Sequence, residues 1–204
     1  MDPDSSTFPA TLEVDYSEKP LDKVTTFFRP FVAIPIFVIL VLIGGSGSRW
    51  FWFGAGGILF IPTLLMLLFR RKYPRWWFDW NLALTKFSMR CSVYLALLRD
   101  EYPSTDDEQA VHITIPYPDA PHDLSPGMPL VKWFLAIPHY IVLSVLIVAA
   151  VVCIIIAWFA VLFTGKYPRS LFDFIVGTLR WSLRVSAYAF LLTTDDYPPF
   201  SLER

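Results

Sequence analysis

The charged residues best placed to bind a ligand form two matching triplets. Each triplet is an aspartate, a basic residue seven positions later, and another basic residue four positions after that. The triplets are Asp79, Lys86 and Arg90, and Asp173, Arg180 and Arg184. Seven and four residues are about two turns and one turn of an α-helix, so each triplet lies on one helical stripe. The spacing favours scaffold contacts within the protein, with binding of anionic lipid headgroups by the basic stripe as the functional alternative.

A dense basic cluster directly follows an apolar run. Its members are Arg70, Arg71, Lys72 and Arg75. A basic cluster at the end of a membrane segment places that end in the cytoplasm, beside anionic headgroups. Together with the basic residues of the two stripes, these four are the candidates for contact with lipid or with a partner protein.

His139 is an ionisable residue inside another apolar run, where such a group usually marks function. Its counterpart in the first half is Ile36, so any role would belong to one half only. A neutral histidine bonded to a neighbouring helix is favoured over a proton relay or a cofactor ligand. His112 and His122 lie near aspartates, but their spacing matches no recognised metal-ligand pattern. Catalytic motifs are also absent, so the sequence predicts no catalytic residue, no cofactor and no metal site.

These candidates lie in an internal duplication. Lys-Tyr-Pro-Arg occurs at 72–75 and again at 166–169, and matching residues then continue at a constant offset. One inserted residue in the second stretch precedes its final Tyr-Pro pair. A long match of this kind indicates two copies of one unit. We place the first copy at residues 1–103 and the second at 104–204.

The composition indicates a membrane protein. The chain is 55% hydrophobic and only 17% charged, with a mean hydropathy of +0.49, which is more apolar than a soluble domain. A net charge of -1 without a broad basic surface excludes nucleic acid as an expected partner. The first twenty residues lack the apolar region of a signal peptide.

In the first copy the pattern predicts a strand at 11–16, a transmembrane hairpin at 24–69 and an amphipathic helix at 75–98. Within the hairpin, residues 50–69 form a run of twenty residues without Asp, Glu, Lys or Arg. Twenty residues match a hydrocarbon core of about 30 Å. The amphipathic helix is expected at the membrane surface, because charges at mid-depth cost several kcal/mol each. A third span with its charges facing protein is the alternative.

The second copy predicts a strand within 111–117, a hairpin at 131–164 and an amphipathic helix at 169–192. Residues 133–165 carry no formal charge. As one helix this stretch would be about 50 Å long and strongly tilted, whereas the arms of a hairpin would be about 25 Å. The duplication favours the hairpin, which inserts both copies the same way up. The lack of Gly or Pro between 138 and 165 favours the single helix.

The motif KYPR-x-x-FDF, followed by Arg180-Trp181 and by Tyr-Pro-Pro-Phe at 197–200, resembles an uncharacterised bacterial membrane-protein family catalogued as a domain of unknown function. The first copy departs from this pattern, with Lys86-Phe87 in place of Arg-Trp. The resemblance implies a bacterial inner-membrane setting and no assigned activity.

The sequence therefore predicts an all-α integral membrane protein of two tandem repeats, each a transmembrane hairpin plus an interfacial amphipathic helix, with short extramembrane strands. We expect it in the bacterial inner membrane with both termini in the cytoplasm. The expected function is a non-enzymatic scaffold or accessory subunit that binds anionic lipids, shapes the bilayer, self-associates or joins other membrane proteins. A small repeat-built transporter or channel is the alternative, ranked second because the spans offer few polar residues beyond Thr63, His139 and Ser144.

Overall fold

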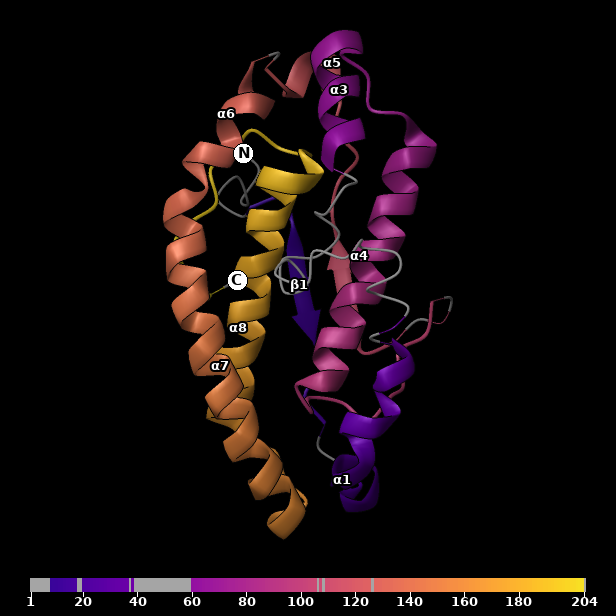
Figure 1. Cartoon of the computed structure of the whole chain (residues 1–204), viewed down its shortest axis with the longest axis vertical. Coiled ribbons are helices and arrows are strands. Elements are labelled where there is room, and N and C mark those ends of the chain that lie inside the picture. The colour runs from indigo at the N-terminus through magenta and orange to yellow at the C-terminus, as the bar shows by residue number, and fades with distance from the viewer. Residues whose placement is uncertain are drawn as a thin grey trace, which may run out of the picture.

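The computed structural model is an elongated, mostly helical molecule built around a two-stranded sheet (Figure 1). It describes residues 8–17, 20–36, 38, 60–105, 107, 109–125 and 127–203. The strands are β1 (Thr11–Val14) and β2 (Val111–Thr114), and the helices are α1 (Lys23–Val32), α3 (Phe60–Arg70), α4 (Arg75–Leu95), α5 (Ala120–Asp123), α6 (Met128–Leu135), α7 (Ile137–Thr164), α8 (Arg169–Ser186) and the π-helix η2 (Ala187–Leu191).

The two predicted strands pair with each other. They are antiparallel, with Leu12 opposite Ile113 and Glu13 opposite His112. Alternate residues point to opposite faces of a strand, and here the two apolar residues are buried while Glu13 and His112 are exposed. The sheet therefore joins the first copy to the second through one apolar face.

The two copies exchange their packing partners. Strand β1 of the first copy packs against α8 of the second, and β2 packs against α4; α1 likewise packs against α7, and α6 against α3. In Figure 1, α4 runs from the top of the molecule toward the bottom, whereas α8 runs from the bottom toward the top. Rotating the molecule by 180° in the plane of the picture brings α1 to the place of α6. The copies are thus related by an approximate twofold axis and run in opposite directions along the long axis. This corrects the expectation that both lie the same way up along that direction.

Buried tyrosines of the repeated Lys-Tyr-Pro-Arg motif hold this exchange together. The Tyr73 hydroxyl donates to the Leu191 carbonyl at 3.0 Å, and the Tyr167 hydroxyl donates to the Ala96 carbonyl at 3.1 Å. Residues 96 and 191 are equivalent in the two copies. Carbonyls at the end of a helix have no partner within the helix. Each copy therefore satisfies a helix-end carbonyl of the other.

The tyrosine that follows each strand makes a second reciprocal contact. Tyr16 donates to the Tyr167 carbonyl at 2.7 Å, and Tyr117 donates to the Tyr73 carbonyl. An arginine of the opposite copy covers each ring, which adds a cation–π contact. These pairs are Arg169 over Tyr16 at 4.5 Å and Arg75 over Tyr117 at 4.8 Å.

The hairpin predicted at 131–164 is wrong. Residues 137–164 form one continuous helix, α7, which ends at Gly165 with φ 72°. With no Gly or Pro from 139 to 164, nothing interrupts its backbone hydrogen bonds. Among the described helices, α7 is the one long and apolar enough to cross a membrane. The expectation that both termini are cytoplasmic depended on this hairpin and loses its basis. Of the first hairpin, residues 37 and 39–59 lie outside the described part of the chain.

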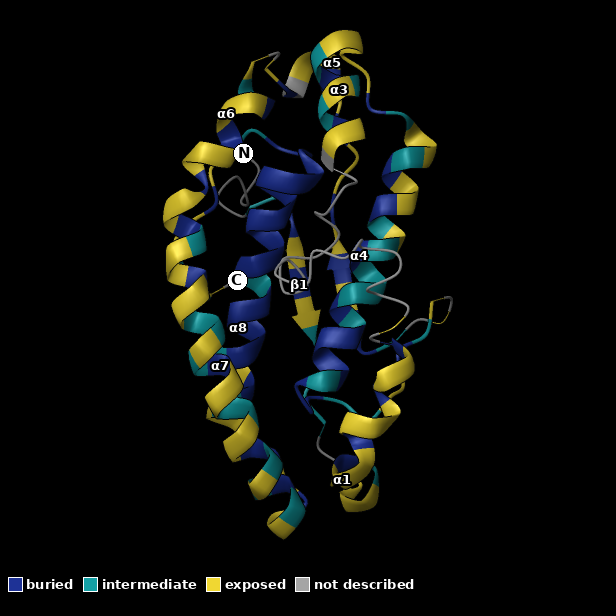
Figure 2. Ribbon diagram, viewed as in Figure 1, coloured by how far each residue is buried: buried dark blue, intermediate teal, exposed yellow. Residues whose placement is uncertain are grey.

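Both amphipathic helices form, but α8 does not lie at a surface. It is the most buried of the long α-helices, dark blue in Figure 2, and is covered by α7 and β1. Its interfacial placement was therefore wrong, because the twofold arrangement encloses it. The residue inserted in the second copy falls in η2, so a π-helical turn absorbs it. Leu97 and Leu192 then end the two helices with matching φ values of 63° and 56°.

Replacing Tyr73 or Tyr167 by Phe is expected to lower the free energy of unfolding by about 1–3 kcal/mol, because each change leaves a buried carbonyl without its donor. The two effects should be equal within error, since the contacts are equivalent. Chemical denaturation in mild detergent measures them. Tyr102→Phe, which alters a half-exposed tyrosine, is the control; an equal loss there would contradict the assignment.

Candidate functional site

A cavity of about 680 Å³ lies where α3 meets α4, and three of the four clustered basic residues line it. These are Arg70, Lys72 and Arg75, all of which are exposed. Arg71, the fourth member of the cluster, is exposed but does not line the cavity. We call this cavity the basic pocket.

A short, tightly held turn positions the three cations. Helix α3 ends at Arg70, and Arg71 turns the chain with φ 48°. Tyr73 is then buried and anchored to the second copy, as described above. Pro74 precedes the first residue of α4 with extended geometry, so Arg75 begins the new helix. The cations therefore project from a turn whose middle is fixed in the core.

The opposite wall of the basic pocket comes from the second copy. It includes Tyr117, whose ring makes the cation–π contact with Arg75. It also includes Asp119, which forms a hydrogen bond with His122 at 2.8 Å. Arg75 also pairs with Asp79 at 3.5 Å, where both side chains are largely exposed and the pair is weak. Three cations against one lining carboxylate give the pocket a positive potential suited to an anion.

Burial raises the pKa of Tyr73, the phenol in the pocket wall, well above its ordinary value. Tyr73 therefore stays neutral at any physiological pH and adds no negative charge. The sign of the pocket is set by the arginines and the lysine.

Aromatic side chains surround the same end of the molecule. Trp76 and Trp80 are exposed on the first turns of α4, and Phe69 is exposed near the end of α3. Trp77 donates from its indole nitrogen to the Thr63 hydroxyl at 2.8 Å. Tryptophan beside basic residues is typical of a membrane–water interface.

The arginines of the second stripe have a different role from lipid contact. Arg180 donates to the carbonyls of Leu12 at 3.1 Å and Leu202 at 2.9 Å. Arg184 is buried and donates to the Glu203 carbonyl at 2.7 Å. Their hydrogen bonds hold the C-terminal segment against α8. This corrects their assignment as lipid-facing residues.

The first stripe is less enclosed. Arg90 donates to the Ser104 carbonyl at 2.7 Å, in the place that Arg184 occupies in the second copy. Lys86 is partly exposed. Neither residue lines the basic pocket, so the structure does not bring the stripe and the cluster together.

His139 is fully buried and contacts residues of α8 and of the C-terminal segment. Its Nδ1 accepts a hydrogen bond from the Trp181 indole at 3.0 Å, and its ring stacks on Phe200 at 4.0 Å. The expected hydrogen bond to a neighbouring helix is present, whereas the Nε2 of His139 is buried and has no hydrogen-bond partner among the described residues. Ile36 and Phe87 occupy the equivalent positions, so one apolar pair has been replaced by one hydrogen-bonded pair.

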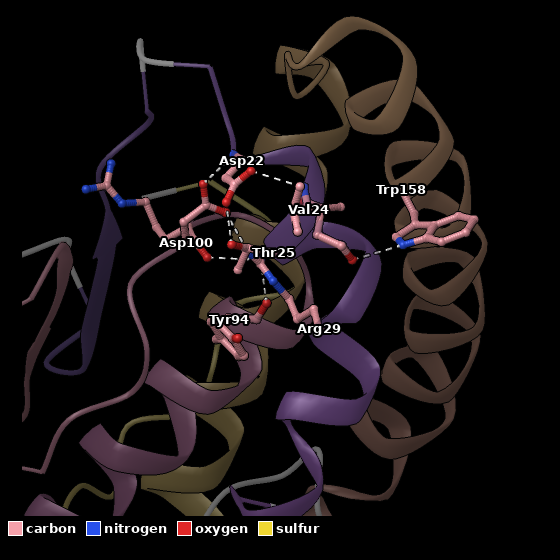
Figure 3. Close-up of polar contacts among 9 residues, drawn as sticks. Asp22, Val24, Thr25, Arg29, Tyr94, Asp100 and Trp158 are labelled. Carbon is pink, nitrogen blue, oxygen red and sulfur yellow. Dashed lines mark hydrogen bonds and ion pairs between the residues drawn. The ribbon is translucent and has the colours of Figure 1, made fainter.

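Two buried cations escaped the sequence analysis. Arg29 is 1% exposed, pairs with Asp100 and donates to the carbonyls of Tyr94 and Arg99 at 3.0 Å each. In Figure 3 its side chain reaches from α1 toward Asp100, and its guanidinium lies over the Tyr94 ring at 4.5 Å. Asp100 also accepts from the Asp22 amide.

Lys132 occupies the equivalent position in the second copy and makes two of the three equivalent polar contacts. It pairs with Asp195 at 2.7 Å, donates to the Thr194 carbonyl at 2.7 Å, and lies 5.3 Å from the Tyr188 ring centre. Asp195 accepts from the Ser125 amide, which is equivalent to Asp22. The signal was present in the sequence: each cation lies four residues before an Ala-Ile-Pro that both copies share. Because both clusters are buried and internally paired, they are structural.

Burial lowers the pKa of Lys132, although the neighbouring Asp195 opposes this effect. Burial alone would raise the pKa of Asp195, but hydrogen bonds from Lys132 and the Ser125 amide bring it below its ordinary value. The carboxylate is therefore held ionised in the folded protein, where it compensates the buried ammonium.

The sequence profile of one family, a domain of unknown function (DUF4389), matches residues 129–201. The match begins in α6 and ends in the C-terminal segment, so it covers the helical part of the second copy. It supports the resemblance to an uncharacterised family. No curated protein and no solved structure matches the chain.

Replacing Asp195 by Asn is expected to lower the free energy of unfolding by about 3 kcal/mol at pH 7, because it leaves the buried Lys132 uncompensated. Asp196→Asn, which changes the exposed neighbour, is the control and should cost much less.

The pH dependence gives an independent check. Because the pKa of Asp195 is lowered on folding, its contribution is present above the unfolded value of about 3.9 and is lost as the pH falls through the folded value. The wild-type protein should therefore lose stability below about pH 4 more steeply than Asp195→Asn. Parallel curves for the two proteins, measured by thermal unfolding in detergent, would contradict the role given to Asp195.

Proposed function

We propose that this protein is a non-enzymatic membrane scaffold or accessory subunit that holds anionic lipid headgroups in the basic pocket. The observation that carries the proposal is the convergence of Arg70, Lys72 and Arg75 on one cavity beside exposed tryptophans. Arginine binds phosphate oxygens with paired donors, and lysine adds a compact charge. Each basic residue near an anionic surface contributes about 1 kcal/mol.

A duplicated apolar surface supports contact with hydrocarbon. Several large apolar residues that are exposed in one copy have an equivalent in the other that is exposed to nearly the same extent. Phe31 and Phe134 are 67% and 66% exposed, and Phe69 and Phe163 are 77% and 79%. Exposed apolar surface of this extent marks a membrane or a protein partner. The all-round apolar character of α7 favours the membrane.

The proposed setting is the bacterial inner membrane, with anionic phospholipids as ligands. Other membrane proteins, or further copies of this chain, are the proposed protein partners. The two ends of the molecule differ in a way that suits this role. Where the first copy has Arg70, Arg71 and Trp76, the second has Thr164, Gly165 and Ser170. An asymmetric charge of this kind orients a protein toward the cytoplasmic side.

Transport is the second candidate function, and the opposite direction of the two copies favours it. Copies of inverted orientation are the building plan of many secondary transporters. The exposed polar face of the sheet, with Glu13 and His112, lies near the middle of the long axis (Figure 1). Such a face is compatible with a membrane only where it is covered or lines water.

Cysteine labelling decides whether α7 crosses the bilayer. Ser125→Cys and Ser170→Cys flank opposite ends of α6–α7, in a background without Cys91 and Cys153. A membrane-impermeant maleimide should label them from opposite sides of the membrane. Labelling from the same side would mean that α7 lies along the membrane, and would remove the transport candidate.

Lipid binding is tested by exploiting the duplication. Lys72→Gln with Arg75→Gln should weaken binding of phosphatidylglycerol to the detergent-solubilised protein by about 2 kcal/mol, or roughly thirtyfold. The equivalent pair, Lys166→Gln with Arg169→Gln, removes the same charges and the same cation–π and ion-pair contacts. Fluorescent-lipid titration compares the two. Equal weakening by both pairs would contradict a specific site at the basic pocket.

A further inference from the structure

A second cavity, of about 330 Å³, lies between α1, the end of α4 and α7. In Figure 1, α1 is at the opposite end of the molecule from α3 and α5, which border the basic pocket. Apart from Arg29, its lining is apolar: Pro30, Leu95, Leu97, Ile154, Ile155 and Trp158. We call this cavity the α1–α7 groove.

The charge of Arg29 is already balanced. Its terminal nitrogens bond to Asp100 and to two backbone carbonyls, as described above. The Nε–H group of Arg29 is buried and has no hydrogen-bond partner among the described residues. A buried donor without an acceptor costs about 1–3 kcal/mol. Because Arg29 lines the groove and is already paired with Asp100, a neutral acceptor suits it and a second anion would be unfavourable.

The groove opens onto the exposed apolar side of α7. Ile155 lines it and is 53% exposed, and Val152 and Phe159 are exposed one turn before and after. The other polar group in the wall is already used, since the Trp158 indole donates to the Thr26 carbonyl at 3.2 Å (Figure 3). A ligand entering from this side would meet hydrocarbon walls and the buried Arg29 side chain.

We propose that the α1–α7 groove takes one acyl chain of a glycerolipid, with an ester carbonyl oxygen accepting a hydrogen bond from Arg29 Nε–H. The inference rests on the proposed contact between α7 and the hydrocarbon of a membrane. A single chain suits the cavity, which is at the small end of the range of about 300–1,000 Å³ for ligand pockets. The ester carbonyl is neutral, so it satisfies the donor without placing a second anion beside Asp100.

The test is photolabelling of the full chain in nanodiscs by a phospholipid with a diazirine in its acyl chain, followed by peptide mapping. We expect label on Leu95 and Leu97, of which Leu97 is buried by its own chain. Ile155→Trp should fill the groove and reduce that label about tenfold, equivalent to about 1.4 kcal/mol. Ile156→Trp is the matched control, because Ile156 is 52% exposed but does not line the groove.

The possible outcomes separate this inference from the proposed function. Label on Val148 and Val152 but not on Leu95 and Leu97 would overturn the groove and leave membrane contact standing. No label anywhere on α7 would overturn both. Label at Leu97 that resists Ile155→Trp, in a variant with unchanged circular dichroism, would also overturn the groove.

The hydrogen bond to Arg29 has its own test. An ether-linked lipid carries the same diazirine chain but lacks the ester carbonyl. It should label Leu95 and Leu97 several-fold less than the ester lipid does. Equal labelling by the two lipids would overturn the assignment of the ester carbonyl to Arg29.

Discussion

The structure depends on the exchange of contacts between two copies of one unit. Each copy ends its striped helix with a carbonyl that a buried tyrosine of the other copy satisfies, Tyr73 for Leu191 and Tyr167 for Ala96. Neither copy can bury its strand alone, because β1 packs on α8 and β2 on α4. The two-stranded sheet is therefore the seam of an internal pseudo-dimer, in which the stability of each half requires the other. A two-stranded sheet by itself would be marginal in water.

Burying a cation in each half is the main electrostatic cost of this arrangement. Arg29 and Lys132 solve it in the same way, with a carboxylate, helix-end or loop carbonyls and a tyrosine face. Such a cluster stabilises little compared with an apolar core, but losing one partner is costly. Arg29 makes three of these hydrogen bonds and Lys132 makes two. Arginine has five N–H donors, and the Nε–H of Arg29, a residue that lines the α1–α7 groove, has no partner among the described residues.

The two copies share a frame but differ at their ends, and the proposed function follows from that difference. The basic pocket needs Arg70, Lys72 and Arg75 on one side and Tyr117 and Asp119 on the other, so each half supplies one wall. Threonine and glycine replace two of the clustered arginines at the opposite end. An anionic lipid would thus meet one charged end, while the apolar surface is repeated on both halves.

The sequence by itself determined the duplication, the helical class, the location of the two strands and the positions of the striped helices. These features depend on the spacing of residues and on local backbone preferences, both of which can be read from one sequence. It also identified the clustered cations and predicted the hydrogen bond of His139 to a neighbouring helix. Only the tertiary structure decided that residues 137–164 are one helix and that the two copies run in opposite directions along the long axis of the molecule. It also decided that Arg180 and Arg184 bind the C-terminal segment instead of lipid. The reason is physical: an arginine on a helical stripe presents the same donors to a headgroup phosphate and to a backbone carbonyl. Which acceptor it meets depends on segments distant in the sequence.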